Sequence, residues 1–495
     1  MKDGKAAAVT MPDWLGQRAA SLGDRLALMA GDERLTFAEL DLQVAQTARR
    51  LAGLGVAAGV RVALLLRNGA PFVVLTHALV RLGAVMVPLN ARLAAPEVAW
   101  QLADSRAAFL VHDDELAPVA EAACHSAPGV VSLSARAVAR AREADVAMYD
   151  RIDLSALQGI IYTSATSGRP KGVMLSFGSH WWNAVASAFN LGLDRDDRWL
   201  APLPLFHVGG LAILWRSVIY GIPAVVHEGF DPEAVNRAID EEGVTNVSVV
   251  STMLRRMLDA RGERPYPPSL RCVLLGGGPA PASLLDRCVR LGVPVAPTYG
   301  LTEAASQVAT LRPEDLARRP GSAGKALFPT EIKIEAGEIL VRGPAVMLGY
   351  AGLPDETARA LRGGWLHTGD LGFLDDEGYL YVTERKEDLI ICGGENVYPA
   401  EVEAVLVAHP SVEDAGVIGM PDAEWGQVVA AAVRPRPGVR LTEADVQIFC
   451  RDRLAGYKIP RRVWFVDDLP RSPSGKLIRR MLRDQVPASA GGAGE

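Results

Sequence analysis

Short apolar runs alternate with amphipathic runs along the first two thirds of the chain. Val60–Leu66 and Ala84–Pro88 predict strands, and the segment between them, Pro71–Leu82, has the apolar spacing of a helix that ends at Gly83. This strand–helix–strand order is typical of a sheet with much parallel pairing. The pattern therefore predicts an α/β fold for this part of the chain.

The same rhythm returns after residue 230. Asp231-Pro232 predicts a helix start, with aspartate as the N-cap and proline in the first helical position, and Gly243 predicts its end. Val247–Val250 and Cys272–Leu275 are expected to be buried strands. Each is followed by small residues, Ser251-Thr252 and Gly276–Ala280. Ligands of open α/β sheets bind outside the carboxyl ends of the strands, so these segments are candidate binding loops.

The pattern changes near Gly321. Glu331–Val341 and Gly378–Val382 predict short antiparallel strands with glycine turns, which indicates a small barrel-like subdomain. A charged segment, Glu384–Asp388, follows and is interpreted as a domain boundary. Beyond it, helices are expected near 401–408 and 443–454, the second capped by Thr442 with Asp445 in the capping-box position. Residues 113–150 are expected to form helix and loop.

Composition narrows the class of protein. The chain has 495 residues, is 49% hydrophobic and carries a net charge of −6, so it has no basic field for nucleic acid or an anionic membrane. The five cysteines are scattered, with no C-x-x-C pair, so neither a zinc site nor a disulfide framework is indicated, and a reducing cytoplasm fits best. No signal peptide or membrane span is expected, because His77 and Arg81 interrupt the most apolar stretch.

Tyr162–Val173 is the most distinctive stretch of the sequence. It offers four hydroxyls (Thr163, Ser164, Thr166 and Ser167), several backbone N–H groups and the ammonium of Lys171. Such a loop after an apolar strand can hold a polyphosphate. The same composition occurs in ordinary surface turns, and the glycine spacing does not match the G-x-x-x-x-G-K-[ST] phosphate loop.

Further short motifs follow in a fixed order: Thr298–Glu303, Thr368–Asp370, Arg385 with its charged neighbours, Ile391–Pro399 and Pro473–Arg479. Together with the 162–173 loop they resemble the adenylate-forming superfamily of acyl-CoA synthetases, adenylation domains and luciferases, over about residues 12 to 485. The resemblance implies a large N-terminal domain of stacked αβαβα sheets (1–384), a hinge (385–388) pivoting at Glu387, a small mobile α+β domain (389–487) and a disordered tail (488–495).

The resemblance also implies roles for individual residues. The carboxylic acid would react with ATP to give an acyl-adenylate, and coenzyme A would then displace AMP. Expected catalytic residues are Lys476, Thr302, Glu303 and His207, with Glu303 as the Mg²⁺ ligand and His207 as a gate to the thiol channel. Expected ATP-binding residues are Thr163, Ser164, Thr166, Ser167, Lys171, Gly276, Gly277, Gly278, Pro279, Tyr299, Gly300, Thr302, Asp370, Arg385 and Lys476.

Coenzyme A is expected at Gly393, Gly394 and Glu395, where the glycines would let the pantetheine arm pass close to the backbone. Cys392 beside them is rejected as a nucleophile, because it lacks an evident base. A lone histidine is more often a buried structural residue, and a lone lysine is more often solvated. The surrounding motifs favour function for both His207 and Lys476.

A narrower set of motifs resembles the o-succinylbenzoate–CoA ligases of menaquinone biosynthesis: His180–Asn183, Asp197–Leu200, Pro204–Gly210, Arg216–Gly221 and Leu274–Pro281. These motifs are expected to surround the acyl pocket. The substrate-binding set is His207, Thr252, Gly300 and Ser306. A second substrate carboxylate would need a polar partner, and the candidates are His207, Arg216, Thr252, Arg256 and Ser306.

Three alternatives stay open. The chain could act on another acyl or aryl acid, load a carrier protein in trans, or bind nucleotide without turnover. Ala165 stands where most of the superfamily has glycine, and Glu387 where aspartate or lysine is more common, which puts efficiency in question. The expected partners are a small carboxylic acid, ATP and coenzyme A, with no nucleic acid and no membrane span. Whether the protein forms an oligomer is left open.

Overall fold

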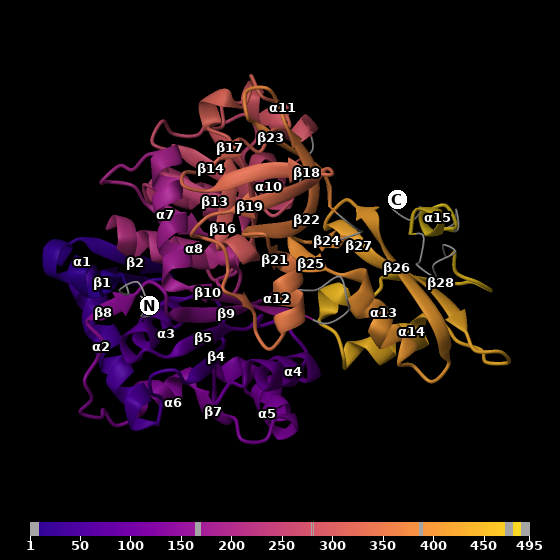
Figure 1. Ribbon diagram of the computed structural model, residues 1–495, viewed down its shortest axis with the longest axis horizontal. Coiled ribbons are helices and arrows are strands. Elements are labelled where there is room, and N and C mark those ends of the chain that lie inside the picture. Colours follow the sequence, from indigo (N-terminus) through magenta and orange to yellow (C-terminus); the bar gives the residue numbers. More distant parts are fainter. Residues whose placement is uncertain are drawn as a thin grey trace, which may run out of the picture. The chain divides into compact units, whose positions relative to one another are not determined.

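The computed structural model describes residues 9–163, 170–278, 280, 282–385, 390–470 and 479–486. It divides into two compact units. The first comprises Met1–Ala91, Gln101–Tyr162 and Gly172–Glu384, and the second comprises Arg92–Trp100, Thr163–Lys171 and Arg385–Glu495. Figure 1 shows the chain coloured along its sequence, with the first unit in indigo to orange and most of the second in orange to yellow.

Two large sheets form the first unit. The seven-stranded sheet has the order β20-β10-β9-β5-β4-β6-β7, with strands Gly349–Tyr350, Lys171–Ser176, Leu157–Thr163, Val85–Pro88, Arg61–Leu65, Phe109–His112 and Val131–Ser134. The nine-stranded sheet has the order β17-β16-β15-β14-β13-β11-β12-β2-β3, with strands Lys325–Ala326, Ser306–Thr310, Val295–Leu301, Cys272–Gly276, Asn246–Val250, Trp199–Ala201, Ala224–Val226, Leu26–Ala30 and Glu33–Thr36.

Helices buried on nearly every side contribute to the core between these sheets. Helix α3 (Ala70–Leu82) and helix α8 (Val208–Tyr220) are mostly apolar and have buried side chains on nearly every face, as expected for helices inside a core. Their side chains share one hydrophobic cluster with residues of β4, β5, β11 and β12. Helices α9 (Pro232–Glu241), α10 (Ser251–Arg261) and α11 (Ala282–Arg290) cover the other face of the nine-stranded sheet, in a second cluster. The unit is thus built in alternating layers of helices and sheets, as expected.

Local signals explain the helix ends. Gly83 adopts φ +63° at the end of α3 and closes the helix through its backbone N–H, a conformation that glycine reaches without strain. At the start of α9 the Asp231 carboxylate accepts from the N–H of Ala234. Both positions are as predicted. In residues 113–150, expected to be helix and loop, the chain also forms strand β7 at the edge of the seven-stranded sheet, beside α5 (Ala117–Ser126) and α6 (Ala135–Arg140).

A smaller antiparallel sheet completes the first unit. It contains β18 (Glu331–Glu335), β19 (Glu338–Arg342), β21 (Leu361–Arg362), β22 (Trp365–Leu374) and β23 (Leu380–Arg385). The remaining elements of the unit are α1 (Trp14–Leu22), α2 (Phe37–Gly53), α7 (Phe177–Leu191), α12 (Pro354–Ala360) and the two-stranded pair β1 (Thr10–Pro12) and β8 (Arg151–Asp153). Helix α4 (Ala95–Ser105) belongs partly to each unit.

The second unit has its own sheet and core. Strands β24 (Ile390–Cys392), β25 (Glu395–Val397), β26 (Val412–Asp422), β27 (Gly426–Pro435) and β28 (Arg462–Phe465) form the sheet. Helices α13 (Pro399–Val407) and α14 (Glu443–Arg451) pack against it, and α15 (Arg479–Arg483) follows. Thr442 and Asp445 form the expected capping box at α14. Throughout the ranges that the structure describes, no helix is long and apolar enough to span a membrane, and each cysteine is free.

Candidate active site

Several candidate residues lie where strands of the nine-stranded sheet end. Strands β11, β13, β14 and the first half of β15 run parallel, so their carboxyl ends lie on one edge of the sheet. At or after these ends come His207, Thr252, the glycines Gly276 to Gly278, and the segment Tyr299 to Glu303. The sheet therefore gathers residues predicted separately to bind the acid, the nucleotide and the metal.

Tyr299 and Asp370 meet across two sheets. The Tyr299 hydroxyl donates to Asp370 Oδ2 at 2.7 Å, and both side chains are buried. The Thr368 hydroxyl accepts from the backbone N–H of Asp370 at 3.1 Å and donates to the carbonyl of Ile339 at 2.7 Å. The Asp370 carboxylate is thereby held in one direction, as the predicted ribose-binding role would need.

Gly276 ends β14, and Gly277 and Gly278 follow it. Gly277 has φ +81°, and a Cβ on it would lie 2.8 Å from Val250 Cγ1. A Cβ on Gly276 would lie 3.1 Å from Thr298 Cγ2. Side chains of the protein itself therefore occupy the space beside both glycines, and an adenine site at this turn stays a prediction. Gly278 is exposed, and Pro279 lies outside the described residues.

A tight hairpin carries Gly300 and Ser306. A Cβ on Gly300 would lie 1.9 Å from the carbonyl oxygen of Ser306, so only glycine fits there. Ala305 and Ser306 have φ +56° and +127°, conformations that cost about 1–3 kcal/mol each for side chains of this kind. The Asn183 amide holds the hairpin by donating to the carbonyls of Ala304 at 3.3 Å and Gln307 at 2.9 Å. Backbone strain of this kind is often stored at binding sites.

Glu303 lies in a short 3-10 turn, Thr302–Ala304, directly after β15. Its side chain is half-buried, and the Tyr350 hydroxyl donates to Oε1 at 2.9 Å. No group of three or more histidine, cysteine, aspartate or glutamate side chains is arranged for a metal anywhere in the described residues. A single carboxylate suits Mg²⁺ that arrives with nucleotide phosphates, since this ion is commonly held by one or two carboxylates plus phosphate oxygens.

His207 begins α8 after a braced loop. It is the N-cap of the helix, and its ring lies 4.3 Å from that of Phe206 between centroids. The Asn68 amide holds the approach by donating to the carbonyl of Leu203 at 2.9 Å. A Cβ on Gly210 would lie 2.3 Å from the carbonyl oxygen of Pro204, which explains a glycine at this turn. The histidine is thus held at a fixed point after β11.

Arg216 is a fully buried cation of α8. One guanidinium nitrogen donates to Asn183 Oδ1 at 3.2 Å and to Gln307 Oε1 at 3.3 Å, and the group stacks over Trp199 at 4.8 Å. No carboxylate pairs with it among the described residues, and its Nε and the Gln307 Nε2 have no protein acceptor. Burial lowers the pKa of Arg216. Arg256, another candidate, is exposed and stacks over Phe230.

The structure describes only the ends of the 162–173 loop. The Tyr162 hydroxyl donates to Asp104 Oδ2 at 2.6 Å and anchors the strand that enters the loop. The Thr163 hydroxyl and the Lys171 carbonyl are 3.5 Å apart, so the two ends lie close together. Ser164, Ala165, Thr166 and Ser167 lie outside the described residues.

In the second unit, Gly393 and Gly394 make a turn with φ +58° and +86°. A Cβ on Gly393 would lie 2.5 Å from Trp425 Cε3, and its N–H donates to the Trp425 carbonyl at 2.8 Å. Glu395 is buried in β25. Burial raises the pKa of Cys392, which agrees with its rejection as a nucleophile. Arg385 ends β23, while Glu387 and Lys476 lie outside the described residues.

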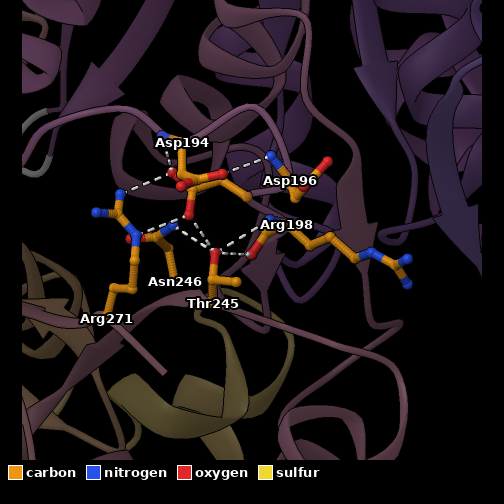
Figure 2. A network of polar contacts seen from close by, with 7 residues as sticks. Asp194, Asp196, Arg198, Thr245, Asn246 and Arg271 are labelled. Carbon is orange, nitrogen blue, oxygen red and sulfur yellow. Dashed lines mark hydrogen bonds and ion pairs between the residues drawn. The ribbon is translucent and has the colours of Figure 1, made fainter. Parts of the chain in front are cut away.

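One predicted location is wrong. Asp197 was expected near the acyl pocket, but it precedes β11 and lies at the amino ends of the strands. It is almost fully buried, and its two oxygens accept from Thr245 Oγ1 at 2.7 Å, Arg271 Nε at 2.9 Å, Arg271 Nη2 at 2.7 Å and the Asp194 N–H at 2.9 Å. Figure 2 labels the partners Asp194, Thr245 and Arg271 in this network. These contacts join the segments before β11, β13 and β14, which is a structural role.

Sequence reasoning also missed residues that hold the site. Tyr350 contacts Glu303, and Asn183 contacts the carbonyls of Ala304 and Gln307 in the hairpin, each from a distant part of the chain. Asn183 stood in a motif that was noted, but its amide contacts depend on the fold. Tyr350 belongs to a strand of two residues, which gives no periodic signal.

The strand ends, the glycine turn, the Tyr299–Asp370 pair and the Glu303 carboxylate suit a protein that binds a nucleotide. Comparison with known families agrees. Residues 15–351 match the AMP-binding enzyme family, and residues 401–476 match the AMP-binding enzyme C-terminal domain. The chain belongs to the AMP-binding enzyme family.

Individual relatives are more specific. The 2-succinylbenzoate–CoA ligase of Geobacillus kaustophilus is 50% identical over 488 residues, covering 97% of this chain and 98% of the relative. That of Bacillus cereus (strain ZK / E33L) is 45% identical, covering 96% and 99%. A structure of a double mutant of the o-succinylbenzoate–CoA synthetase of Bacillus subtilis with a product analogue has a TM-score of 0.93 at 42% identity, covering 96% of this chain and 99% of that one. The amide bond synthetase of Marinactinospora thermotolerans has a TM-score of 0.87 at 30% identity, covering 96% and 100%.

Proposed function

We propose that this protein is an ATP-dependent 2-succinylbenzoate–CoA ligase. It converts 2-succinylbenzoate, ATP and coenzyme A to 2-succinylbenzoyl-CoA, AMP and pyrophosphate. Relatives with this name match nearly the whole chain at 45–50% identity. Structures of the Bacillus subtilis relative are described with the acyl-adenylate intermediate and with ATP and magnesium ion. We place the reaction in the cytoplasm.

The chemistry has two steps. A carboxylate is a poor electrophile, so its oxygen first attacks the α-phosphorus of ATP and pyrophosphate leaves. The thiol of coenzyme A then attacks the carbonyl carbon of the mixed anhydride, and AMP leaves with the bonding electrons. Bound Mg²⁺ would offset negative charge on the phosphates during the first step. Glu303 is the side chain we assign to hold it, together with phosphate oxygens.

We assign the other roles as follows. Thr302 contacts the α-phosphate, Asp370 receives the ribose hydroxyls, and Lys476 bridges the attacking carboxylate and the phosphate. The 162–173 loop holds the β- and γ-phosphates. Gly393 and Gly394 leave room for the pantetheine arm. A change in the position of residues 389–487, with the pivot at Glu387, would withdraw Lys476 before the thiol step.

Arg216 is the observation within this chain that supports the substrate. An isolated buried charge is costly, and proteins normally pair or neutralise it. Here the guanidinium is held by two neutral amides, and it borders Gln307, the residue next to Ser306. 2-Succinylbenzoate brings two carboxylates. We infer that the succinyl carboxylate reacts, and that the ring carboxylate is stabilised by the positive potential of Arg216.

A comparison of two acids tests this assignment. 4-Oxo-4-phenylbutanoate lacks only the ring carboxylate. We expect Arg216→Gln to lower kcat/KM for 2-succinylbenzoate by about 10- to 100-fold, the usual range for loss of a charged hydrogen-bonding interaction, and to change kcat/KM for the monocarboxylate by less than about 3-fold. Pyrophosphate release and thioester formation are followed separately.

The outcomes separate the alternatives. An equal loss of kcat/KM for both acids would show that Arg216 does not recognise the ring carboxylate. Efficient turnover of unrelated acids by the unmodified protein would support the ligase reaction but contradict the assignment of 2-succinylbenzoate as its substrate. Transfer to a carrier protein but not to coenzyme A would indicate a carrier-loading enzyme, and no pyrophosphate with any acid would indicate a nucleotide-binding protein without turnover.

A further inference from the structure

The segment Met347–Tyr350 holds Glu303 at two points. The Met347 backbone N–H donates to the Glu303 carbonyl at 2.8 Å, and the Tyr350 hydroxyl donates to Glu303 Oε1 at 2.9 Å. A hydrogen bond to an ionised carboxylate is roughly twice as strong as a neutral one. The backbone contact fixes where the side chain starts, and the hydroxyl contact fixes the direction in which its carboxylate points.

The same segment is joined to the strand that leaves the 162–173 loop. Strands β10 and β20 pair antiparallel, with Val173 opposite Tyr350. The Leu348 N–H donates to the Met174 carbonyl at 2.9 Å, and the Ala351 N–H donates to the Gly172 carbonyl at 2.7 Å. Residues 347–351 therefore connect the exit strand of the loop to Glu303.

Helix α12 fixes Tyr350 from the other side. The Tyr350 N–H donates to Thr357 Oγ1 at 2.9 Å, and the same hydroxyl donates to the Leu353 carbonyl at 2.8 Å. Gly349 has φ +139°, and a Cβ on it would lie 2.6 Å from Thr357 Cγ2. The strand can approach the helix this closely only with glycine. Tyr350 is consequently held by hydrogen bonds at both its backbone and its hydroxyl.

We propose that Tyr350 is a positioning residue for the divalent cation that accompanies ATP, acting through Glu303. The proposal rests on the proposed function, because adenylation is the step that uses the metal. Among the described residues no cluster of carboxylates or imidazoles could hold the ion, so its affinity depends on the orientation of one carboxylate. The Tyr350 hydroxyl contributes to that orientation, and its strand pairs with β10, which leaves the loop that we assign to the β- and γ-phosphates.

Tyr350→Phe tests the proposal by removing one hydroxyl and little else. The first measurement is Mn²⁺ binding, followed by electron paramagnetic resonance in the presence of a non-hydrolysable ATP analogue. Loss of a hydrogen bond that orients a metal ligand typically costs 10- to 100-fold in metal affinity, so we expect at least about 10-fold weaker binding. The Mg²⁺ concentration for half-maximal pyrophosphate exchange should rise by a similar factor. Thioester formation from supplied acyl-adenylate should change by less than about 2-fold, since that step needs no ATP.

Tyr266→Phe is the matched control. The Tyr266 hydroxyl donates to Asn236 Oδ1 at 2.8 Å on the far side of the nine-stranded sheet, within the cluster that packs against α9 and α10. Its loss should leave Mn²⁺ affinity unchanged. Unchanged Mn²⁺ affinity in Tyr350→Phe, or equal losses in the adenylation and thioester steps, would overturn the proposal. If the unmodified protein releases no pyrophosphate with any acid, the proposed function fails, and the Mn²⁺ measurement still decides the role of Tyr350.

Two further variants guard against a purely structural effect. Tyr350→Phe added to Glu303→Gln should weaken Mn²⁺ binding no further than Glu303→Gln alone, because the hydroxyl acts through that carboxylate. Multiplying losses would overturn the proposal. Thr357→Ala loosens the backbone of Tyr350 without touching its hydroxyl, and we expect a smaller loss of Mn²⁺ affinity, about 3-fold. Unaltered affinity in both Thr357→Ala and Tyr350→Phe would overturn the proposal.

Discussion

Asp197 gives a stability prediction that follows directly from its contacts. The side chain is almost fully buried and accepts four hydrogen bonds, two of them from Arg271. Asp197→Asn removes the charge and turns one acceptor into a donor that faces other donors. Breaking a buried ion pair costs about 3–5 kcal/mol. Arg271 is 36% exposed and can regain water, so we take the lower end, about 3 kcal/mol.

The melting temperature is the practical measurement. The entropy of unfolding is about 2.1 cal/mol/K per residue, which for a unit of roughly 370 residues gives a fall of about 4 °C for 3 kcal/mol. Asp196→Asn is the matched control, because its side chain is 83% exposed on the same loop. Its effect should stay within about 0.5 kcal/mol, or less than 1 °C.

Activity separates a structural role from a role in the pocket. Because Asp197 lies at the amino ends of the strands, we expect Asp197→Asn to keep its KM for the acid and for ATP at 20 °C, within about 2-fold. A melting temperature equal to that of the unmodified protein would refute the argument from buried contacts. A large rise in KM for the acid with an unchanged melting temperature would indicate that Asp197 acts in the acyl site.

Two further predictions concern acid stability and the thiol step. Burial lowers the pKa of His180 and of His77 to about 3, so below pH 6.5 the unfolded chain binds protons that the folded chain does not. The free energy of unfolding should therefore be about 2 kcal/mol lower per histidine at pH 5 than at pH 7. In urea titrations His180→Gln should lose part of this pH dependence, and an identical dependence would contradict the prediction. Gly393→Ala should lower thioester formation from supplied acyl-adenylate by about 10-fold, while pyrophosphate exchange stays within about 2-fold. The alanine Cβ would clash with Trp425, and alanine is strained at φ +58°. Gly438→Ala, with φ +78° and no atom within 4 Å of its Cβ, controls for backbone strain, and equal effects of the two variants would argue against a channel at Gly393.

The rhythm of strands and helices could be predicted because burial imposes a period on the sequence. Helix α3 and the N-cap of α9 are found as expected, since an apolar stripe, a proline and a terminal glycine are local signals. Strand β7 was missed because it has only four residues, Val131–Ser134, none of them fully buried, so its alternating pattern is too short to stand out. Two-residue strands such as β20 have no period at all, and only the fold defines them.

The location of the site was predictable for residues that follow strands and not for residues that precede them. Thr252, Gly276 and Tyr299 lie at or after the carboxyl ends of parallel strands, where ligands gather. Asp197 comes before β11, so it lies at the opposite edge, although its motif is close in sequence to His207. The contact between Tyr350 and Glu303 joins residues 47 positions apart, and no local pattern reports it.

The contrast between Asp197 and Arg216 indicates how the protein divides stability from function. Asp197 has donors for both oxygens from within the chain, so its charge is compensated before any ligand binds. Arg216 is equally buried but rests on neutral amides, with one nitrogen lacking a protein acceptor. A buried cation left in this state raises the free energy of the unliganded protein, and an anionic ligand that supplies the missing charge recovers it. Arg216→Met should therefore leave the melting temperature of the free protein unchanged or raise it. It should also reduce the rise in melting temperature that added 2-succinylbenzoate gives. Loss of several degrees in the free protein, with ligand stabilisation intact, would show that Arg216 serves the core and not the substrate.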